Sequence, residues 1–181
     1  MHTALYAGSF DPITNGMSLI RRGLHLFDRI IVGVANQTSK PPLFTLEERC
    51  ALVRDAIGKH GDAIEVVPFS GLTVDYAAKR GCCAILRGLR AVSDFEFEFQ
   101  LALMNRRLQR NLQTVFFMTD HRWIFVSSSI VKAAASHGGD VSELVPPNVN
   151  ERLTALYRNG QMRTSTPCMD PPQGGYGRKE K

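Results

Sequence analysis

Apolar positions along the chain form two alternating patterns. Short, nearly continuous apolar runs at 3–7, 29–35, 64–69, 83–86 and 114–118 are typical of buried parallel strands. Longer segments with helical spacing lie between or after them, at 16–27, 45–58, 73–80, 94–110, 130–136 and 148–158. Five strands that alternate with helices predict an α/β fold. We expect a Rossmann-like, doubly wound, five-stranded parallel sheet with helices on both faces and a C-terminal helix.

Individual residues predict where some of these helices begin. Thr45 followed by Glu48 fits a capping box, and Ser93 or Asp94 can cap the long helix that runs to about residue 110. Ser127, Ser128 and Ser129 precede the helix at 130–136 and can cap it. The stretch 87–90 is expected to form a tight loop after the fourth strand.

The composition changes near residue 160. Residues 160–181 are rich in Pro, Gly, Ser and Thr and end on basic side chains, which cannot bury a core. We therefore expect one folded domain over 1–159 and a flexible, disordered tail over 160–181. An arm that becomes ordered against another subunit is the alternative.

Composition and charge exclude several classes of protein. No apolar run approaches the ~18 residues of a membrane span, and no secretory signal precedes the first strand, so we expect a cytoplasmic protein. The net charge is +5, and the tail supplies +2 of it (four basic minus two acidic residues). The remaining +3 suits a small anionic ligand better than a nucleic acid. The four cysteines (Cys50, Cys82, Cys83 and Cys168) lack a metal-binding spacing and are expected to be reduced thiols.

Residues with side chains suited to ligand binding follow the carboxyl ends of the predicted strands. Ligands of such sheets bind beyond the carboxyl ends of the strands. That edge receives Ser9 and Phe10, Lys40, residues 70–73, residues 87–90 and residues 123–129. The set contains cations, hydroxyls and glycines with almost no acid, which predicts a ligand with several negative charges. Taken singly, Lys40 could be a solvated lysine, the arginines could be ion-pair partners, Glu98 could be a plain helix-face acid and the serines could be caps.

Six motifs in order resemble one family. They are G-S-F-D-P-I-T-N-G at 8–16, S-K-P-P-L-F-T-L-E-E-R at 39–49, F-S-G-L-T-V-D-Y at 69–76, R-G-L-R-A at 87–91, D-F-E-F-E at 94–98 and W-I-F-V-S-S-S at 123–129. Together they are similar to bacterial phosphopantetheine adenylyltransferases of the nucleotidyltransferase superfamily. The resemblance extends from about residue 3 to 158, so residues 1–159 would be the nucleotidyltransferase domain.

The resemblance implies a reaction and its partners. ATP and 4′-phosphopantetheine would react, with Mg²⁺, to give dephospho-coenzyme A and pyrophosphate in coenzyme A biosynthesis. Catalysis would be mostly positioning and charge neutralisation, without a covalent intermediate. The family also implies a homohexamer that is inhibited by coenzyme A. No nucleic-acid or membrane partner is expected.

The resemblance also assigns roles to residues. Ser9, Lys40, Thr73 and Arg87 would bind the acceptor, and Ser9, Lys40 and Arg90 would be catalytic. The ATP-binding set would comprise Ser9, Phe10, Gly16, Met17, Gly88, Leu89, Arg90, Glu98, Trp123, Ile124, Phe125, Val126, Ser127, Ser128 and Ser129.

One position departs from the family. The family reads Thr-x-Gly-His where this chain reads Thr14-Asn15-Gly16-Met17. Met17 lies one position closer to Phe27 than the family's His does, so we infer a missing His rather than an exchange to Met. A thioether cannot donate the imidazole's hydrogen bond. The loss also rotates the following helix by about 100°, which the first turn must absorb if Leu19, Ile20 and Leu24 are to stay in the core. None of the remaining histidines is an obvious substitute: His25 lies about two turns along the helix, and the nearest candidate is His121, which sits just before the Trp123 segment.

Two other hypotheses remain open at this point. One is another member of the superfamily, such as a nicotinate-mononucleotide adenylyltransferase or a cytidylyltransferase. The other, motivated by the missing His, is a catalytically weak protein that binds ATP or coenzyme A with the same fold.

Overall fold

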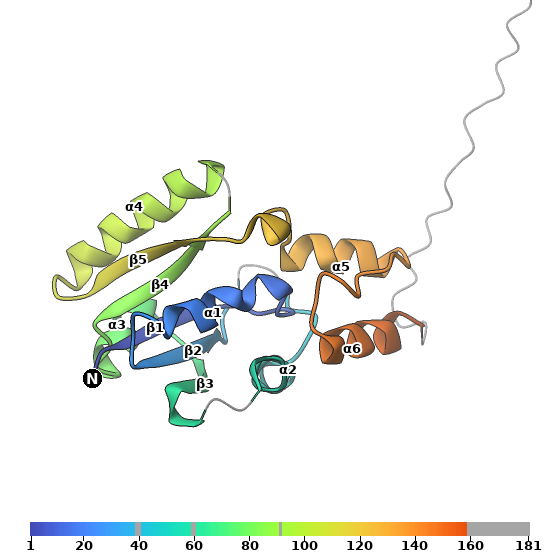
Figure 1. The fold of residues 1–181 in the computed structure, drawn as a ribbon, viewed down its shortest axis with the longest axis horizontal. Helices are drawn as coiled ribbons and strands as arrows, with labels where there is room; N and C mark the ends of the chain where they lie inside the picture. Colours follow the sequence, from blue (N-terminus) through green and yellow to red (C-terminus); the bar gives the residue numbers. More distant parts are fainter. Residues whose placement is uncertain (39–40, 59–60, 91, 159–181) are drawn as a thin grey trace, which may run out of the picture.

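A five-stranded, all-parallel sheet forms the centre of the molecule (Figure 1). The computed structural model describes residues 1–38, 41–58, 61–90 and 92–158. The strands are β1 (Thr3–Gly8), β2 (Arg29–Ala35), β3 (Ile64–Phe69), β4 (Ala84–Leu89) and β5 (Gln113–Met118), in the order β3-β2-β1-β4-β5. The predicted Rossmann-like parallel sheet is therefore confirmed.

Helices cover both faces of the sheet, as predicted. A larger buried cluster packs one face against helices α1 (Ser18–Gly23), α2 (Leu46–Ile57), α5 (Ser128–Ser136) and α6 (Pro147–Arg158). A smaller cluster on the other face packs against α3 (Thr73–Lys79), and α4 (Val92–Leu108) lies against β4 and β5. Single 3₁₀ turns, η1 (Asn15–Met17), η2 (Gly61–Ala63) and η3 (His121–Trp123), complete the described elements.

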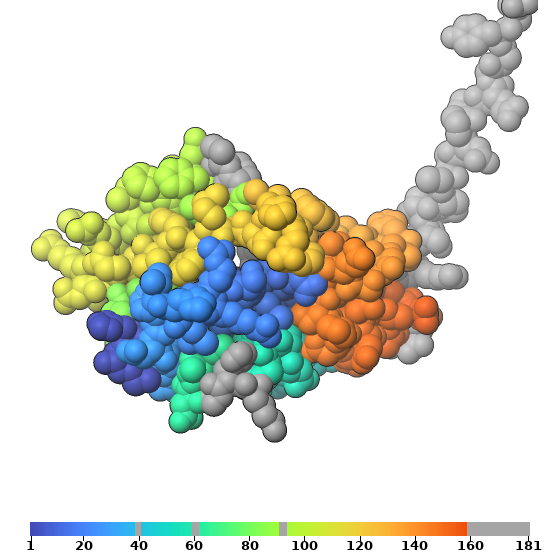
Figure 2. Space-filling model, viewed as in Figure 1, coloured from blue at the N-terminus to red at the C-terminus, as the bar shows by residue number. Residues whose placement is uncertain are grey.

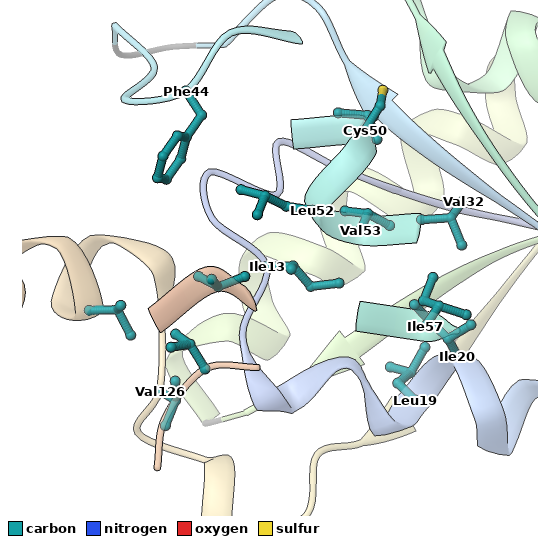
Figure 3. Close-up of a cluster of buried hydrophobic side chains, with 14 of the residues drawn as sticks. Ile13, Leu19, Ile20, Val32, Phe44, Cys50, Leu52, Val53, Ile57 and Val126 are labelled. Atoms are coloured by element: carbon teal, nitrogen blue, oxygen red, sulfur yellow. The ribbon is translucent and has the colours of Figure 1, made fainter. Parts of the chain in front are cut away.

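The strand order shows where along the sheet a ligand can bind. The sheet grows from β1 toward β2 and β3 on one side and toward β4 and β5 on the other. Connections therefore leave the carboxyl ends of β1 and β4 toward opposite faces, which opens a crevice at this switch point. The larger core cluster extends up to that crevice, because Ile13 and Val126 are buried in it with Leu19 and Val53 (Figure 3).

The start of α1 differs from its prediction. The predicted helix over 16–27 is a 3₁₀ turn followed by the short α1, which ends at Gly23. A 3₁₀ turn takes 3.0 residues instead of 3.6, so it offsets part of the rotation that a missing residue causes. Leu19 and Ile20 accordingly stay buried, at 3% and 1% exposure, and Leu24 is half-buried. The segment before β2 thus combines a 3₁₀ turn with a short α1 and still keeps Leu19 and Ile20 in the core.

Two further boundaries were predicted wrongly. Residues 87–89 continue β4 rather than forming a loop, because Arg87, Gly88 and Leu89 pair with β5 and the Leu89 carbonyl accepts from the amide of Thr119. The long helix α4 begins at Val92, so Asp94 lies in its first turn and is not its cap. The capping box of α2 and the Ser127 cap of α5 are confirmed.

Several predictions fall on residues that the structure does not describe. They are Lys40, the tail over 160–181 and Cys168. Cys50, Cys82 and Cys83 are free thiols. Within the described ranges, no helix is long and apolar enough to cross a membrane.

Candidate functional site

Two adjoining pockets lie at the carboxyl edge of the sheet. The first pocket has a volume of about 450 Å³, and the described residues that line it are Ala7, Gly8, Ser9, Asp11, Ala35, Gln37, Thr38, Pro41, Phe69, Thr73, Arg87, Ser128, Ser129 and Lys132. The second pocket has a volume of about 240 Å³ and is lined by Tyr6, Ala7, Gly8, Ser9, Phe10, Pro12, Ile13, Thr14, Gly16, Met17, Leu19, Arg87, Gly88, Arg90, Glu98, Thr119, Trp123, Val126, Ser127 and Ser128. Both pockets share Ser9, Arg87 and Ser128, so two ligands can meet there.

Most of the residues predicted from the sequence come together in this place. Ser9, Thr73 and Arg87 line the first pocket. Phe10, Gly16, Met17, Gly88, Arg90, Glu98, Trp123, Val126 and Ser127 line the second, and Ser128 and Ser129 open α5 beside the first. Leu89 is buried in the core, while Ile124 and Phe125 are 44% and 58% exposed and line neither pocket. Their predicted part in ATP binding therefore stays a prediction.

Arg87 stands between the two pockets and is held rigidly. Its Nε donates to Glu98 Oε2 at 2.7 Å, its Nη2 donates to Glu98 Oε1, and its Nη1 donates to the Ala7 carbonyl at 3.3 Å. Burial works to lower the pKa of the guanidinium, but the hydrogen bonds and charge of Glu98 outweigh it and the net shift is upward. The site therefore keeps a fixed positive charge where the pockets join.

Arg90 brings a second cation to the second pocket. Its Nε donates to Asp94 Oδ2 at 3.0 Å, four positions along the chain, and its Nη1 lies 3.4 Å from the Val126 carbonyl. The guanidinium thus bridges the start of α4 and the segment before α5. Trp123 follows on the same rim, with the Arg122 guanidinium 5.8 Å from its ring centroid. An aromatic ring beside cations and hydroxyls suits a nucleotide.

The loop after β1 is shaped by the residues beneath it. Phe10 adopts φ +46° and the Asp11–Pro12 peptide is cis. Arg49 is 1% exposed, and its guanidinium donates to the carbonyls of Phe44, Ser9 and Ala35 at 3.2, 2.7 and 2.8 Å. Because Ser9 follows β1 and Ala35 ends β2 in the wall of the first pocket, one buried guanidinium joins these two strand ends to the segment before α2.

Asp11 forms a second tie across the site. Its carboxylate is 4% exposed and accepts from the amides of Leu43 and Phe44 at 2.9–3.0 Å and from Lys132 Nζ at 2.5 Å. Burial works to raise the pKa of this carboxyl, but the hydrogen bonds from Lys132 and the two amides outweigh it and hold the pKa below its usual range. Asp11 therefore stays ionised and fixes Lys132 at the wall of the first pocket.

Because folding lowers the pKa of the Asp11 carboxyl, the free energy of unfolding should depend on this residue and on pH. Asp11→Asn is expected to lower the free energy of unfolding by about 2 kcal/mol at pH 7, since it weakens a charged hydrogen-bond network. A carboxyl whose pKa falls on folding stabilises the native state above its unfolded pKa, near 3.8, and loses that effect as the pH falls further. Urea unfolding at pH 7, 5 and 3.5 should show a constant difference between the two proteins down to pH 5 and a smaller one at pH 3.5. A difference that grows on acidification would contradict this role of Asp11.

No histidine of the described segments lines either pocket. His121 is exposed on η3 beside Asp120, and His25 lies beyond the end of α1. His60 lies outside the described residues. Met17 occupies the wall of the second pocket after the Thr14-Asn15-Gly16 turn, which is anchored by hydrogen bonds from Asn15 to the carbonyls of Glu143 and Leu144.

Sequence reasoning missed several residues that build the site. Asp11 and Arg49 were part of the motifs, but no role was assigned to either, because neither burial nor long-range partners can be read from spacing. Lys132 was missed as well, although it follows Ser128 by one helical turn and therefore shares its face. Gln37 and Thr38 line the first pocket from the loop after β2.

Comparison with known proteins now gives the family. Residues 5–134 match the model of the cytidylyltransferase-like family. A protein of Oleidesulfovibrio alaskensis named phosphopantetheine adenylyltransferase is 60% identical over 155 residues, covering 85% of this chain and 91% of the relative. The chain belongs to the phosphopantetheine adenylyltransferase family. Relatives of the same name from Desulfosudis oleivorans and Anaeromyxobacter dehalogenans are 54% and 55% identical, covering 84% and 83% of this chain and 91% and 92% of each relative.

A solved structure agrees with the fold of this phosphopantetheine adenylyltransferase-family chain. A Vibrio parahaemolyticus protein, provisionally named nicotinate-nucleotide adenylyltransferase, superposes with a TM-score of 0.62 at 18% identity. The match covers 87% of this chain and 96% of that one. At this identity the likeness supports the shared fold and not a shared acceptor.

Proposed function

We propose that this protein transfers the adenylyl group of ATP to 4′-phosphopantetheine, which releases pyrophosphate and forms dephospho-coenzyme A. The observation that carries the proposal is the pair of pockets that meet at Ser9, Arg87 and Ser128, in a chain 60% identical to a phosphopantetheine adenylyltransferase. A reaction between two phosphate-bearing substrates needs such a junction, and cations there offset their mutual repulsion.

The chemistry is one in-line displacement. A phosphate oxygen of the acceptor attacks the α-phosphorus of ATP, a new P–O bond forms, and the bond to the pyrophosphate oxygen breaks. No proton has to leave the attacking oxygen if the phosphate is ionised, so the chain need not supply a base. We assign the acceptor to the first pocket, which Thr73 lines, and the nucleotide to the second. Lys40, also predicted to bind the acceptor, lies outside the described residues.

The residues contribute position and charge. Arg87 supplies a fixed cation at the junction, and Arg90 supplies another beside the nucleotide pocket. The start of α5 presents Ser128, Ser129 and the positive end of a helix dipole to the same region. Holding the two reactants in line is the larger part of such catalysis.

Magnesium is expected to accompany ATP. Among the described residues, no group of three potential acidic, His or Cys ligands gathers anywhere in the fold. The acids of the two pockets, Asp11 and Glu98, are already paired with Lys132 and Arg87. This donor set fits an ion held chiefly by substrate phosphates and water, as Mg²⁺ prefers at nucleotide sites, where it would neutralise phosphate charge.

The outer surface of α4 supports the expected self-association. Its half-buried side carries Asp94, Glu98 and Asn105, whereas apolar side chains point outward. Those exposed by about half or more are Phe95, Phe97, Phe99, Leu103, Met104 and Leu108. The helix lies along one side of the molecule beside β5 (Figures 1 and 2). An exposed apolar face of this size favours burial against another copy, and the proposed assembly is the homohexamer, inhibited by coenzyme A.

A second candidate function rests on the Met17 turn. Without an imidazole donor there, the protein could bind ATP or coenzyme A and turn over poorly. Calorimetry with ATP and with coenzyme A, next to a product assay over hours, separates the two functions. Binding without product favours the second.

The acceptor is tested by a substrate panel. Pyrophosphate release from ATP is expected with 4′-phosphopantetheine and not with nicotinate mononucleotide, and replacing ATP by CTP should remove it. Each nucleotide alone provides the background rate. Equal or faster release with nicotinate mononucleotide, or with CTP, would assign the protein to another activity of the superfamily.

A further inference from the structure

Lys132 lies in the first pocket and had no assigned role. It is on α5, four positions after Ser128 and three after Ser129, so all three share one face of the helix. All three line the first pocket, and the Lys132 side chain is 26% exposed there. An ammonium group therefore faces the same space as two hydroxyls at a helix start.

The charge of Lys132 is only partly compensated. Its ammonium carries three N–H donors, and the hydrogen bond to Asp11 uses one of them. The Asp11 carboxylate also accepts from the amides of Leu43 and Phe44, which share its negative charge. Arg87, the other cation among the described residues of this pocket, is paired with Glu98 through two nitrogens. Lys132 thus retains donors and positive charge toward the pocket.

Given the function proposed above, on which this step rests, we propose that Lys132 binds the phosphate of the acceptor. Asp11 holds Nζ against the pocket wall, and the phosphate monoester takes the remaining N–H donors while the hydrogen bond to Asp11 persists. The ammonium is then in place before the ligand arrives, so little side-chain entropy is lost on binding.

A structural role alone is the competing explanation. Lys132 joins α5 to the loop after β1 across 121 positions of sequence, and its loss could disturb the pocket without any contact to phosphate. The two explanations differ in one respect. Direct contact makes the effect of Lys132 depend on the ligand's phosphate, whereas a purely structural tie affects ligands with and without phosphate alike.

The experiment compares dissociation constants for 4′-phosphopantetheine and pantetheine by calorimetry. Lys132→Met should weaken binding of 4′-phosphopantetheine by about 10- to 100-fold, as expected for a lost charge-assisted hydrogen bond, and leave pantetheine unchanged. Lys132→Arg should recover most of the loss. Arg152→Met removes an exposed ion pair with Glu48 away from both pockets and should change neither constant.

A second variant keeps the test valid if Lys132→Met alone does not fold. Lys132→Met combined with Asp11→Asn removes both charges, so no unpaired carboxylate remains, and it should show the same phosphate-dependent loss. Equal weakening of both ligands, or no change for either, would overturn the proposal. So would an unmodified protein that binds both ligands equally. An unmodified protein that prefers 4′-phosphopantetheine but transfers no adenylyl group would defeat the proposed function alone, and the Lys132 comparison would still stand.

Discussion

Arg87→Met is expected to lower kcat/KM for adenylyl transfer by about 10³-fold. The variant loses at least two charge-assisted hydrogen bonds at the junction of the pockets, each worth about 1.5–3 kcal/mol. It also removes the fixed cation that faces two anionic substrates. Initial rates of pyrophosphate release at varied ATP and 4′-phosphopantetheine measure the effect, and the KM for both substrates should rise.

The matched control is Arg80→Met. Arg80 also pairs with a glutamate, Glu65, at 2.5 Å, but it lines neither pocket. Its replacement should leave kcat/KM within about threefold, as for a change remote from the site. Because Arg87→Met leaves Glu98 without its partner, the double variant with Glu98→Gln checks that folding is not the cause. A similar small loss for Arg80→Met and Arg87→Met would remove Arg87 from the site.

Inserting a His between Gly16 and Met17 is expected to raise turnover by about 10²–10³-fold. One preorganised donor to a developing charge is worth about that factor in other enzymes. The turn that receives it lines the second pocket and is held by Asn15, whose side chain donates to the Glu143 carbonyl at 2.8 Å. The added residue would also let the 3₁₀ turn before α1 relax toward an α-helical turn.

Insertion of Ala at the same point is the control for that experiment. It restores the length of the segment without an imidazole donor. Pyrophosphate release should rise with His and stay near the unmodified rate with Ala. An equal gain from both insertions would mean that the spacing matters and the imidazole does not, and no gain from either would mean that other donors already fill that role.

Local pattern was enough to predict most of the fold. The runs at 29–35 and 64–69 match β2 and β3 residue for residue, since buried parallel strands are almost wholly apolar. The end of β4 was missed because Arg87 and Gly88 resemble loop residues, and only their pairing with β5 extends the strand. Helix α1 was predicted too long because the spacing of apolar residues does not separate a 3₁₀ turn, found at Asn15–Met17, from an α-helical one.

The site was predicted where a residue follows a strand directly and missed where it depends on distant partners. Ser9, Thr73, Arg87 and Ser128 lie at the strand ends or helix starts that the sheet rule selects. The Asp11–Lys132 pair joins residues 121 positions apart, and their spacing in the sequence does not predict the contact.

Transfer of the α-phosphorus itself is the most direct test of the account. The unmodified protein is incubated with ATP labelled at the α-phosphorus, Mg²⁺ and 4′-phosphopantetheine, and the labelled species are separated by chromatography. We expect the label to appear in a product that co-elutes with dephospho-coenzyme A, only when 4′-phosphopantetheine is present and with one pyrophosphate released per product. Label that stays in ATP, or appears only as AMP, would contradict the account.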